Sequence, residues 1–160
     1  MRQYIFRDTD ITGTMDLDIL GDDYTILMEA CFRYCASVSF RVHPYIGFPA
    51  RLLSHRLPIS DNVDALYCKI GKMGIHNGFG ILPYLVGHFR LTDEVKDYIL
   101  HESNTLFGWI DDNPEDIAFY RSDGSVFLHS CTHNGMCTLT PRDDEAISEI
   151  VSNQLWIKID

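Results

Sequence analysis

Two turn dipeptides, Asp123-Gly124 and Asn134-Gly135, constrain the fold of this chain more than any other feature. Both combine residue types that readily adopt the positive φ angles of two-residue β-hairpin loops. The segments that flank them alternate between apolar and polar residues, which is the pattern of strands with one buried face. We therefore predict that residues 117–139 form a three-stranded antiparallel meander.

Taking both dipeptides as two-residue loops predicts a register for the meander. Phe119 pairs with Leu128, Arg121 with Val126, and Thr132 with Cys137. Opposed residues share a sheet face, so one face is apolar and suits a core: Ile117, Phe119, Val126, Leu128, Cys137 and Leu139, with Ser130 and Thr132 at its margin. The other face is amphipathic, and suits either packing under a helix or contact with a partner: Ala118, Tyr120, Phe127, His129, Cys131, His133, Met136 and Thr138.

Helices are predicted on both sides of this meander. Asp22 or Asp23 caps a helix whose apolar residues recur at steps of three and four: Leu27, Ala30, Cys31, Tyr34, Cys35 and Val38. Thr92 caps a second helix with Val95 and Ile99 on its inner face. A third, short helix is predicted to start at Pro141, with its first turn acidic: Asp143, Asp144 and Glu145.

Two further strands complete the prediction, one at residues 4–6 and one at residues 155–159, which we expect to rejoin the sheet. Three prolines predict that residues 41–60 are irregular. The predicted class is α+β, an antiparallel meander sheet packed with about three helices. At 160 residues, the chain has the size of a single domain, which we expect to span residues 1–160.

Composition narrows the kind of protein. The longest apolar run, Ile81–Val86, contains Pro83 and is too short to cross a membrane. The charged start, MRQYIFRDTD, does not resemble a secretion signal. Five cysteines form no disulfide-framework spacing, so we expect free thiols. These features predict a soluble cytoplasmic protein that does not enter membranes.

The net charge of −10 is unevenly distributed along the chain. Residues 41–96 carry +3 and residues 97–160 carry −9. An acidic surface of this kind repels nucleic acid and attracts a basic partner protein. A solvated surface with no partner is the alternative reading of the same charges.

A cluster of potential metal ligands lies in the meander: His129, Cys131, His133 and Cys137. The predicted register places Cys137 on the opposite face from the other three. Residues four apart on a strand are separated by roughly 13 Å, which is too far for His129 and His133 to share one ion. We therefore predict no metal and no cofactor.

Thiol chemistry is the other use of this cluster. Cys131 lies beside His129 and His133, and a neighbouring imidazole can lower the pKa of a thiol and produce a nucleophilic thiolate. The sequence offers no nucleophile elbow and no orienting acid for such a pair, so we assign no catalytic residue. A small metal- or thiol-dependent enzyme that uses residues 129–133 is kept as the alternative function.

The C-terminal part of the chain resembles small immunity proteins of bacterial toxin systems, including those that protect against contact-dependent growth-inhibition toxins. Many of these carry a meander of the type D-x-x-x-Y-x-x-x-G-x-x-x-x-x-x-x-x-H, matched here by Asp116, Tyr120, Gly124 and His133. Asn134 stands where such proteins often have Glu. The resemblance covers about a quarter of the chain and implies a non-enzymatic protein that binds a cognate toxin domain and blocks its active site.

Charge and resemblance together predict which residues contact such a partner, and the acidic balance favours a basic nuclease as the toxin. The candidates are acids and the polar groups of the amphipathic face: Asp111, Asp112, Glu115, Asp116, Asp143, Asp144, Glu145, Tyr120, His129 and His133. The sequence leaves the identity of the toxin and the oligomeric state open.

Overall fold

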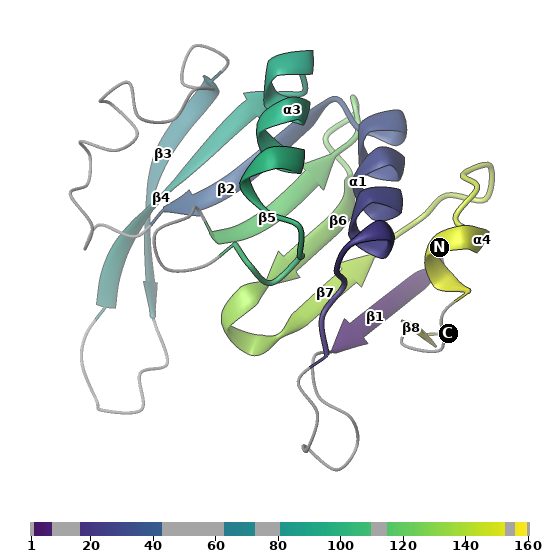
Figure 1. Ribbon diagram of the computed structural model, residues 1–160. Helices are drawn as coiled ribbons and strands as arrows, with labels where there is room; N and C mark the ends of the chain where they lie inside the picture. The colour runs from purple at the N-terminus through teal and green to yellow at the C-terminus, as the bar shows by residue number, and fades with distance from the viewer. Residues whose placement is uncertain are drawn as a thin grey trace.

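Within the part of the chain that the structure describes, eight strands form one antiparallel sheet in the order β3-β4-β2-β5-β6-β7-β1-β8 (Figure 1). Their bounds are β1 Gln3–Arg7, β2 Ser37–Val42, β3 Val63–Lys72, β4 Ile81–Arg90, β5 Glu115–Tyr120, β6 Val126–Cys131, β7 Met136–Leu139 and β8 Trp156–Ile159. This computed structural model describes residues 2–7, 17–42, 63–72, 81–109, 115–152 and 156–159. The predicted α+β class with an antiparallel sheet is confirmed, and the predicted meander is β5-β6-β7.

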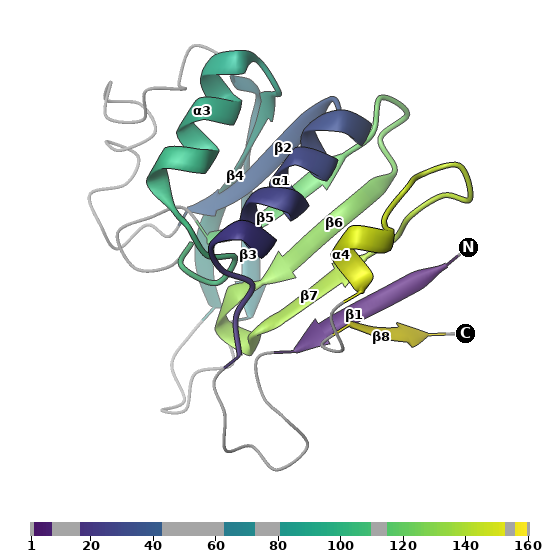
Figure 2. The ribbon, with the colours of Figure 1, turned by 45° about the vertical axis from the view of Figure 1, so that its right-hand side comes forward.

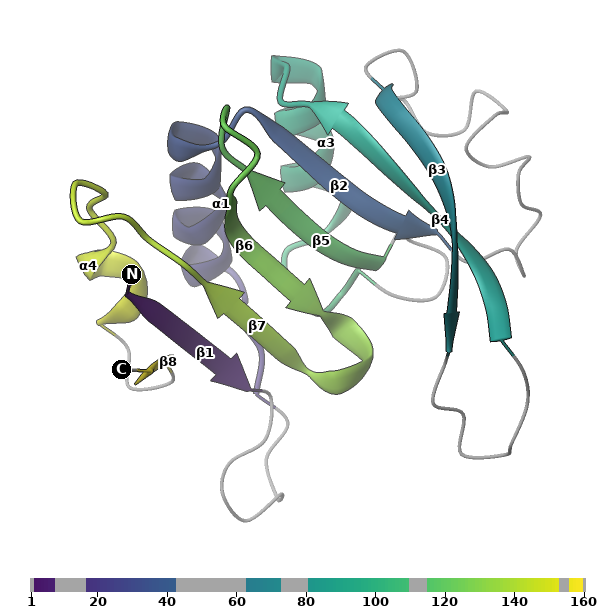
Figure 3. The ribbon, with the colours of Figure 1, turned by 180° about the vertical axis from the view of Figure 1, so that it is seen from behind.

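Helices cover one face of this sheet. They are α1 (Asp22–Tyr34), α3 (Asp93–Glu102) and the short α4 (Ser148–Val151). Figure 2 shows α1 and α3 side by side over the middle of the sheet and α4 beside β1 and β8. Seen from behind, the opposite face carries none of these helices (Figure 3). No helix among the described residues is long and apolar enough to cross a membrane.

The core lies between the helices and the sheet, and an aromatic group joins its three main elements. Trp109 is fully buried, and its ring centroid lies 5.2 Å from that of Phe40 in β2 and 6.0 Å from that of Tyr98 in α3. Its Nε1–H donates to the hydroxyl of Tyr24 in α1 at 3.3 Å. Tyr24 in turn donates to the carbonyl of Ile99 at 3.1 Å. One buried ring thus holds α1, α3 and β2 together.

The N-termini of α1 and α3 are capped differently. Thr92 caps α3 as predicted, because its hydroxyl accepts from the Val95 N–H at 3.4 Å. Neither Asp22 nor Asp23 caps α1, since the N-cap is Gly21 with a φ of 60°. Both aspartates lie in the first turn instead, where a carboxylate stabilises the positive end of the helix dipole.

The predicted apolar stripe of α1 is correct at its centre and wrong at its end. Val38 lies not in the helix but in β2, because the helix ends at Tyr34. The Ala36 N–H donates to the carbonyl of Tyr120 at 2.8 Å, so the chain enters the sheet between β4 and β5. The prediction that residues 41–60 are irregular is therefore wrong at 41 and 42, and residues 43–60 lie outside the described part.

The predicted register holds at the centre of the β5–β6 hairpin and fails at its turn. Phe119 pairs with Leu128 as predicted, but Tyr120, not Arg121, pairs with Val126. The turn is longer by one residue, since the Arg121 N–H donates to the Ser125 carbonyl and Gly124 has a φ of 80°. This shift of register exposes Val126 and buries Phe127, which inverts the predicted placement of both.

The β6–β7 turn is also longer than predicted. Cys131 pairs with Met136, and Ser130 with Cys137, because Thr132–Asn134 forms a 3₁₀ turn that ends at Gly135 with a φ of 53°. The register therefore differs from the predicted one by two residues. A shift of two preserves the faces, so the predicted placement of Cys131 and Cys137 on opposite faces is confirmed.

The predicted start of the third helix at Pro141 is wrong. Residues 141–147 form turns, and α4 begins only at Ser148. The physical reason is Glu145, whose carboxylate is drawn into the protein by Arg121 and does not face solvent in a first helical turn. The terminal strand is confirmed, since β8 pairs with β1.

Candidate functional site

The predicted contact residues lie on two different sides of the sheet. Asp143 and Asp144 are exposed in the loop before α4. Tyr120 and His129 lie on the sheet face opposite α1 and α3, because Ala118 pairs with His129 and alternates with Phe119, which packs against α1. Asp111 and Asp112 lie outside the described residues, as does the side chain of His133. The predicted set therefore does not form one surface.

Glu145 is not a surface residue, and its assignment to the contact surface is wrong. Its carboxylate forms a two-pronged ion pair with the guanidinium of Arg121, with Oε1 to Nε and Oε2 to Nη2 both 2.6 Å. The two side chains are only 7% and 5% exposed. The Arg142 N–H also donates to Oε2 at 2.6 Å. This carboxylate is already fully engaged inside the protein.

The guanidinium of Arg121 also donates hydrogen bonds to backbone carbonyls at the ends of two strands. Its Nη1 donates to the Val126 carbonyl at 2.8 Å and its Nη2 to the Thr140 carbonyl at 2.7 Å. The guanidinium also lies 5.1 Å above the ring of Phe127, a favourable cation–π position. The pair therefore attaches the loop that carries Asp143 and Asp144 to the β5–β6 hairpin.

Stability at acid pH should depend on this carboxyl. Burial raises the pKa of Glu145, but the hydrogen bonds from Arg121 and the Arg142 N–H, with their positive charges, outweigh burial and hold the pKa below its ordinary value of 4.5. A folded-state pKa below the unfolded one stabilises the fold above pH 4.5, and this contribution is lost as pH falls through the folded pKa. Urea unfolding from pH 7 to 3 should show this fall, with a flatter profile in Glu145→Gln.

The slope of stability against pH is the quantity to compare, since Glu145→Gln also weakens the fold at neutral pH. Glu149→Gln removes an exposed carboxyl from the neighbouring helix α4 and should keep the wild-type slope. Equal slopes in wild type and Glu145→Gln would contradict the assignment.

Glu115 is buried and Asp116 is half-buried, which does not suit their prediction as residues that contact a partner. Glu115 is 6% exposed. Asp116 accepts from Arg41 Nη1 at 2.6 Å and from the Thr132 N–H at 2.9 Å. Asp116 has a φ of 51°, an uncommon conformation for a residue with a side chain. Its carboxylate therefore joins β2, β5 and the β6–β7 turn.

The sheet face opposite α1 and α3 presents aromatic, hydroxyl and imidazole groups around the end of β5. Tyr120 is the last residue of β5. Its hydroxyl is 3.1 Å from Ser39 Oγ, and its ring centroid is 5.0 Å from that of His88. His129 is exposed on β6 and Cys131 is half-buried two residues further on. The structure contains the predicted amphipathic face. Of the two uses predicted for it, packing under a helix is not observed among the described residues.

The thiol of Cys131 does not have the surroundings of a nucleophile. Burial raises its pKa, and the nearby carboxylate of Asp116 raises it further, against smaller lowering effects from Asn134 and Arg41. The Asn134 side-chain amide donates to its sulfur at 3.2 Å. The net rise of the pKa disfavours a thiolate at neutral pH, so these contacts do not support the alternative of a thiol enzyme.

The other cysteines whose side chains the structure describes, Cys31, Cys35 and Cys137, lie toward the helices. Cys31 and Cys137 are fully buried, and burial raises the pKa of both thiols well above its ordinary value. Burial is also the main cause that raises the pKa of Cys35 to about 12. Among the described residues, no group of three or more His, Cys, Asp or Glu side chains is placed to hold a metal ion.

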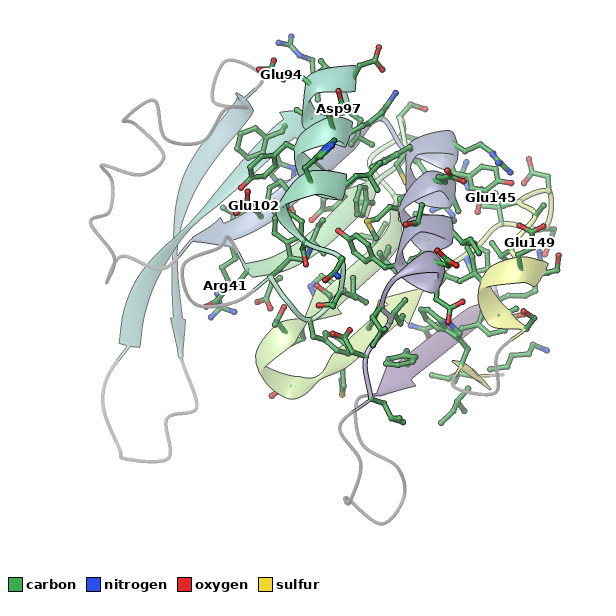
Figure 4. The ribbon with its side chains drawn as sticks, in the orientation of Figure 1. Arg41, Glu94, Asp97, Glu102, Glu145 and Glu149 are labelled. Atoms are coloured by element: carbon green, nitrogen blue, oxygen red, sulfur yellow. The ribbon has the colours of Figure 1, made fainter. Side chains whose placement is uncertain are left out.

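The exposed acids of the helices are the surface feature that the predicted contact set missed. We define this acidic layer as the exposed carboxylates of α1, α3, α4 and the loop before α4: Asp22, Asp23, Glu29, Asp93, Glu94, Asp97, Glu102, Asp143, Asp144 and Glu149. Figure 4 shows Glu94, Asp97 and Glu102 on α3 and Glu149 on α4. The acids of the helices could have been predicted from the sequence to be exposed, because acids that flank an apolar helical stripe must face solvent.

Comparisons with models of protein families, with curated proteins and with solved structures returned no match. The functional argument therefore rests on the contacts and charges described above.

Proposed function

We propose that this chain is a toxin-neutralising immunity protein, which binds a basic toxin domain through its acidic layer and blocks that domain. The observation that carries the proposal is the concentration of exposed carboxylates on the helices. α1 has three acidic residues and one basic residue, and α3 has four and one. Acidic helices above a sheet suit a positively charged protein surface, such as that of an enzyme that cleaves nucleic acid.

The internal ion pairs support the same reading. Glu145 and Asp116 are each held by an arginine within the protein, so they stiffen the fold and leave the surface negative. A rigid, pre-arranged surface loses little conformational entropy when it binds. Such a surface is suited to fast and tight association with a partner of opposite charge.

The proposal predicts that the gene immediately upstream encodes a large secreted protein whose C-terminal domain is the toxin, and the direct test uses that domain. That domain should bind the purified chain and lose its toxicity when both are expressed together. Reversal of charge on one helix, Glu94→Lys with Asp97→Lys and Glu102→Lys, should weaken binding at least about tenfold, mainly through slower association. Surface plasmon resonance at low and high salt measures both rates and the salt dependence.

A shape control separates charge from side-chain packing. Glu94→Asp with Asp97→Glu and Glu102→Asp keeps every charge and should bind within about twofold of wild type. An upstream domain that does not bind, or one that binds the charge-reversed variant equally well, would overturn the proposal.

A further inference from the structure

Two exposed leucines lie within the acidic layer, at the end where α3 finishes and α1 begins. Leu20 directly precedes the N-cap of α1 and is 58% exposed, and Leu100 lies in the last turn of α3 and is 36% exposed. The Gly21 N–H donates to the Asn104 carbonyl at 2.9 Å, which holds the start of α1 beside the end of α3. We name Leu20 and Leu100 the leucine pair.

The backbone around Leu20 is fixed from both sides. Leu20 forms a β-bridge with Thr105. The carboxylate of Asp18 accepts from the Ile19 N–H at 2.7 Å and from the Phe107 N–H at 3.1 Å. Ile19 is 3% exposed, so the alternation of an extended chain turns Leu20 outward. A leucine on a fixed backbone loses little conformational entropy when a partner covers it.

Exposed carboxylates surround the leucine pair. Residues 17–23 and 97–108 contain five acids and no lysine or arginine. Lys96 lies one turn before Leu100, but its Nζ is 3.1 Å from the Asp93 carboxylate, which compensates its charge. Figure 4 shows that α3 carries two of the acids at this end. The leucines therefore form an apolar centre with a rim of four exposed carboxylates, those of Asp22, Asp23, Asp97 and Glu102.

This rim decides which partner fits. A second copy bound through the same patch would bring identical carboxylates together around the leucines, and like charges repel. A surface with an apolar recess between lysine and arginine side chains places apolar groups at the centre and opposite charge at the rim. We propose that the leucine pair enters such a recess and is the apolar anchor of the contact with the basic partner. This inference rests on the proposed function, because it states which residues retain the bound partner.

Binding kinetics separate the anchor from the charges. Leu20→Ala with Leu100→Ala should raise the dissociation rate of the upstream toxin domain at least about tenfold, because apolar contacts at the centre of an interface slow dissociation. The association rate and its salt dependence should stay within about twofold of wild type, since no charge changes. Surface plasmon resonance with the full chain measures both rates. An unchanged dissociation rate would overturn the proposal.

Two isoleucines on β8 provide a matched control. Ile157 and Ile159 are 59% and 37% exposed, close to the 58% and 36% of the leucines. They lie on the last strand in the sheet order, whereas α1 and α3 cover the middle of the sheet (Figure 2). Ile157→Ala with Ile159→Ala should therefore bind like wild type. Equal losses in the two double variants would contradict a specific contact at the leucine pair.

Hydrogen exchange of the chain alone tests the fixed backbone. The Gly21 and Leu106 N–H groups donate to the carbonyls of Asn104 and Ile19, both at 2.9 Å. These two amides should exchange at least about a hundredfold more slowly than in an unfolded peptide, because the ladder must open first. Exchange of both at the rate of an unfolded peptide would overturn the rigid presentation of Leu20.

The charge reversal on α3 separates this inference from the proposed function. If both hold, that variant should mainly slow association, and the leucine variant should mainly speed dissociation. Weaker binding of the α3 variant with normal dissociation of the leucine variant would overturn the anchor and leave the proposed function in place. An upstream domain that does not bind would overturn both.

Discussion

Replacing Arg121 with methionine is expected to lower the free energy of unfolding by about 3–5 kcal/mol. The variant leaves the Glu145 carboxylate, 7% exposed, without its charge partner. It also removes the donors to the Val126 and Thr140 carbonyls. Urea unfolding at pH 7, followed by circular dichroism, measures the loss.

Two comparisons identify the cause. The double variant Arg121→Met with Glu145→Met should regain much of the lost stability, because a buried ion pair can be replaced by apolar groups at little net cost. Arg142→Met removes the partner of Asp123 in an ion pair whose side chains are 46% and 53% exposed, and should cost at most about 1 kcal/mol. A cost below about 1 kcal/mol for Arg121→Met would show that the pair contributes little.

Truncation of Trp109 to alanine is the second large effect, again about 3–5 kcal/mol. The indole is fully buried and contacts β2, α3 and α1 through Phe40, Tyr98 and Tyr24. Its removal leaves a cavity between the helices and the sheet. It also removes the N–H group that donates a hydrogen bond to the Tyr24 hydroxyl. Equilibrium unfolding in urea measures the effect, and Trp156, the other tryptophan, reports by fluorescence.

Trp156 also provides the control. It is 8% exposed on the four-residue edge strand β8, where neighbours can relax more easily. Trp156→Ala should therefore cost less than Trp109→Ala, and Trp109→Phe, which keeps most of the ring contacts, should fall between wild type and Trp109→Ala. Equal costs for the two alanine variants would contradict the central place of Trp109 in the core.

Local patterns predicted those parts of the fold in which neighbours in sequence decide the structure. The two Gly-containing dipeptides marked both turns of the meander, and Thr92 marked the start of α3. Loop length was not predictable, because the Arg121–Ser125 backbone contact adds one residue to the first turn. The long strands β3 and β4 were not predicted, and neither was β2, since its residues continue the helical apolar spacing of α1 as far as Val38.

In the candidate site, too, features that depend on neighbours in sequence were predictable and long-range contacts were not. The acidic balance was readable from composition, and the split of Cys131 from Cys137 followed from strand alternation. Which acids of the loops face solvent was not readable. Glu145 and Asp143 are two residues apart, yet one is buried against Arg121 and the other is 98% exposed.

The sequence alone determined the periods of α1, α3 and the meander strands, the positions of the meander turns and the sign of the surface charge, because these depend on residues a few positions apart. Tertiary structure alone decided which carboxylates are neutralised. Arg41 and Asp116 are 75 residues apart, and Arg121 and Glu145 are 24 apart. Such pairs form only when the sheet brings their strands and loops together, and they leave the carboxylates of the helices exposed.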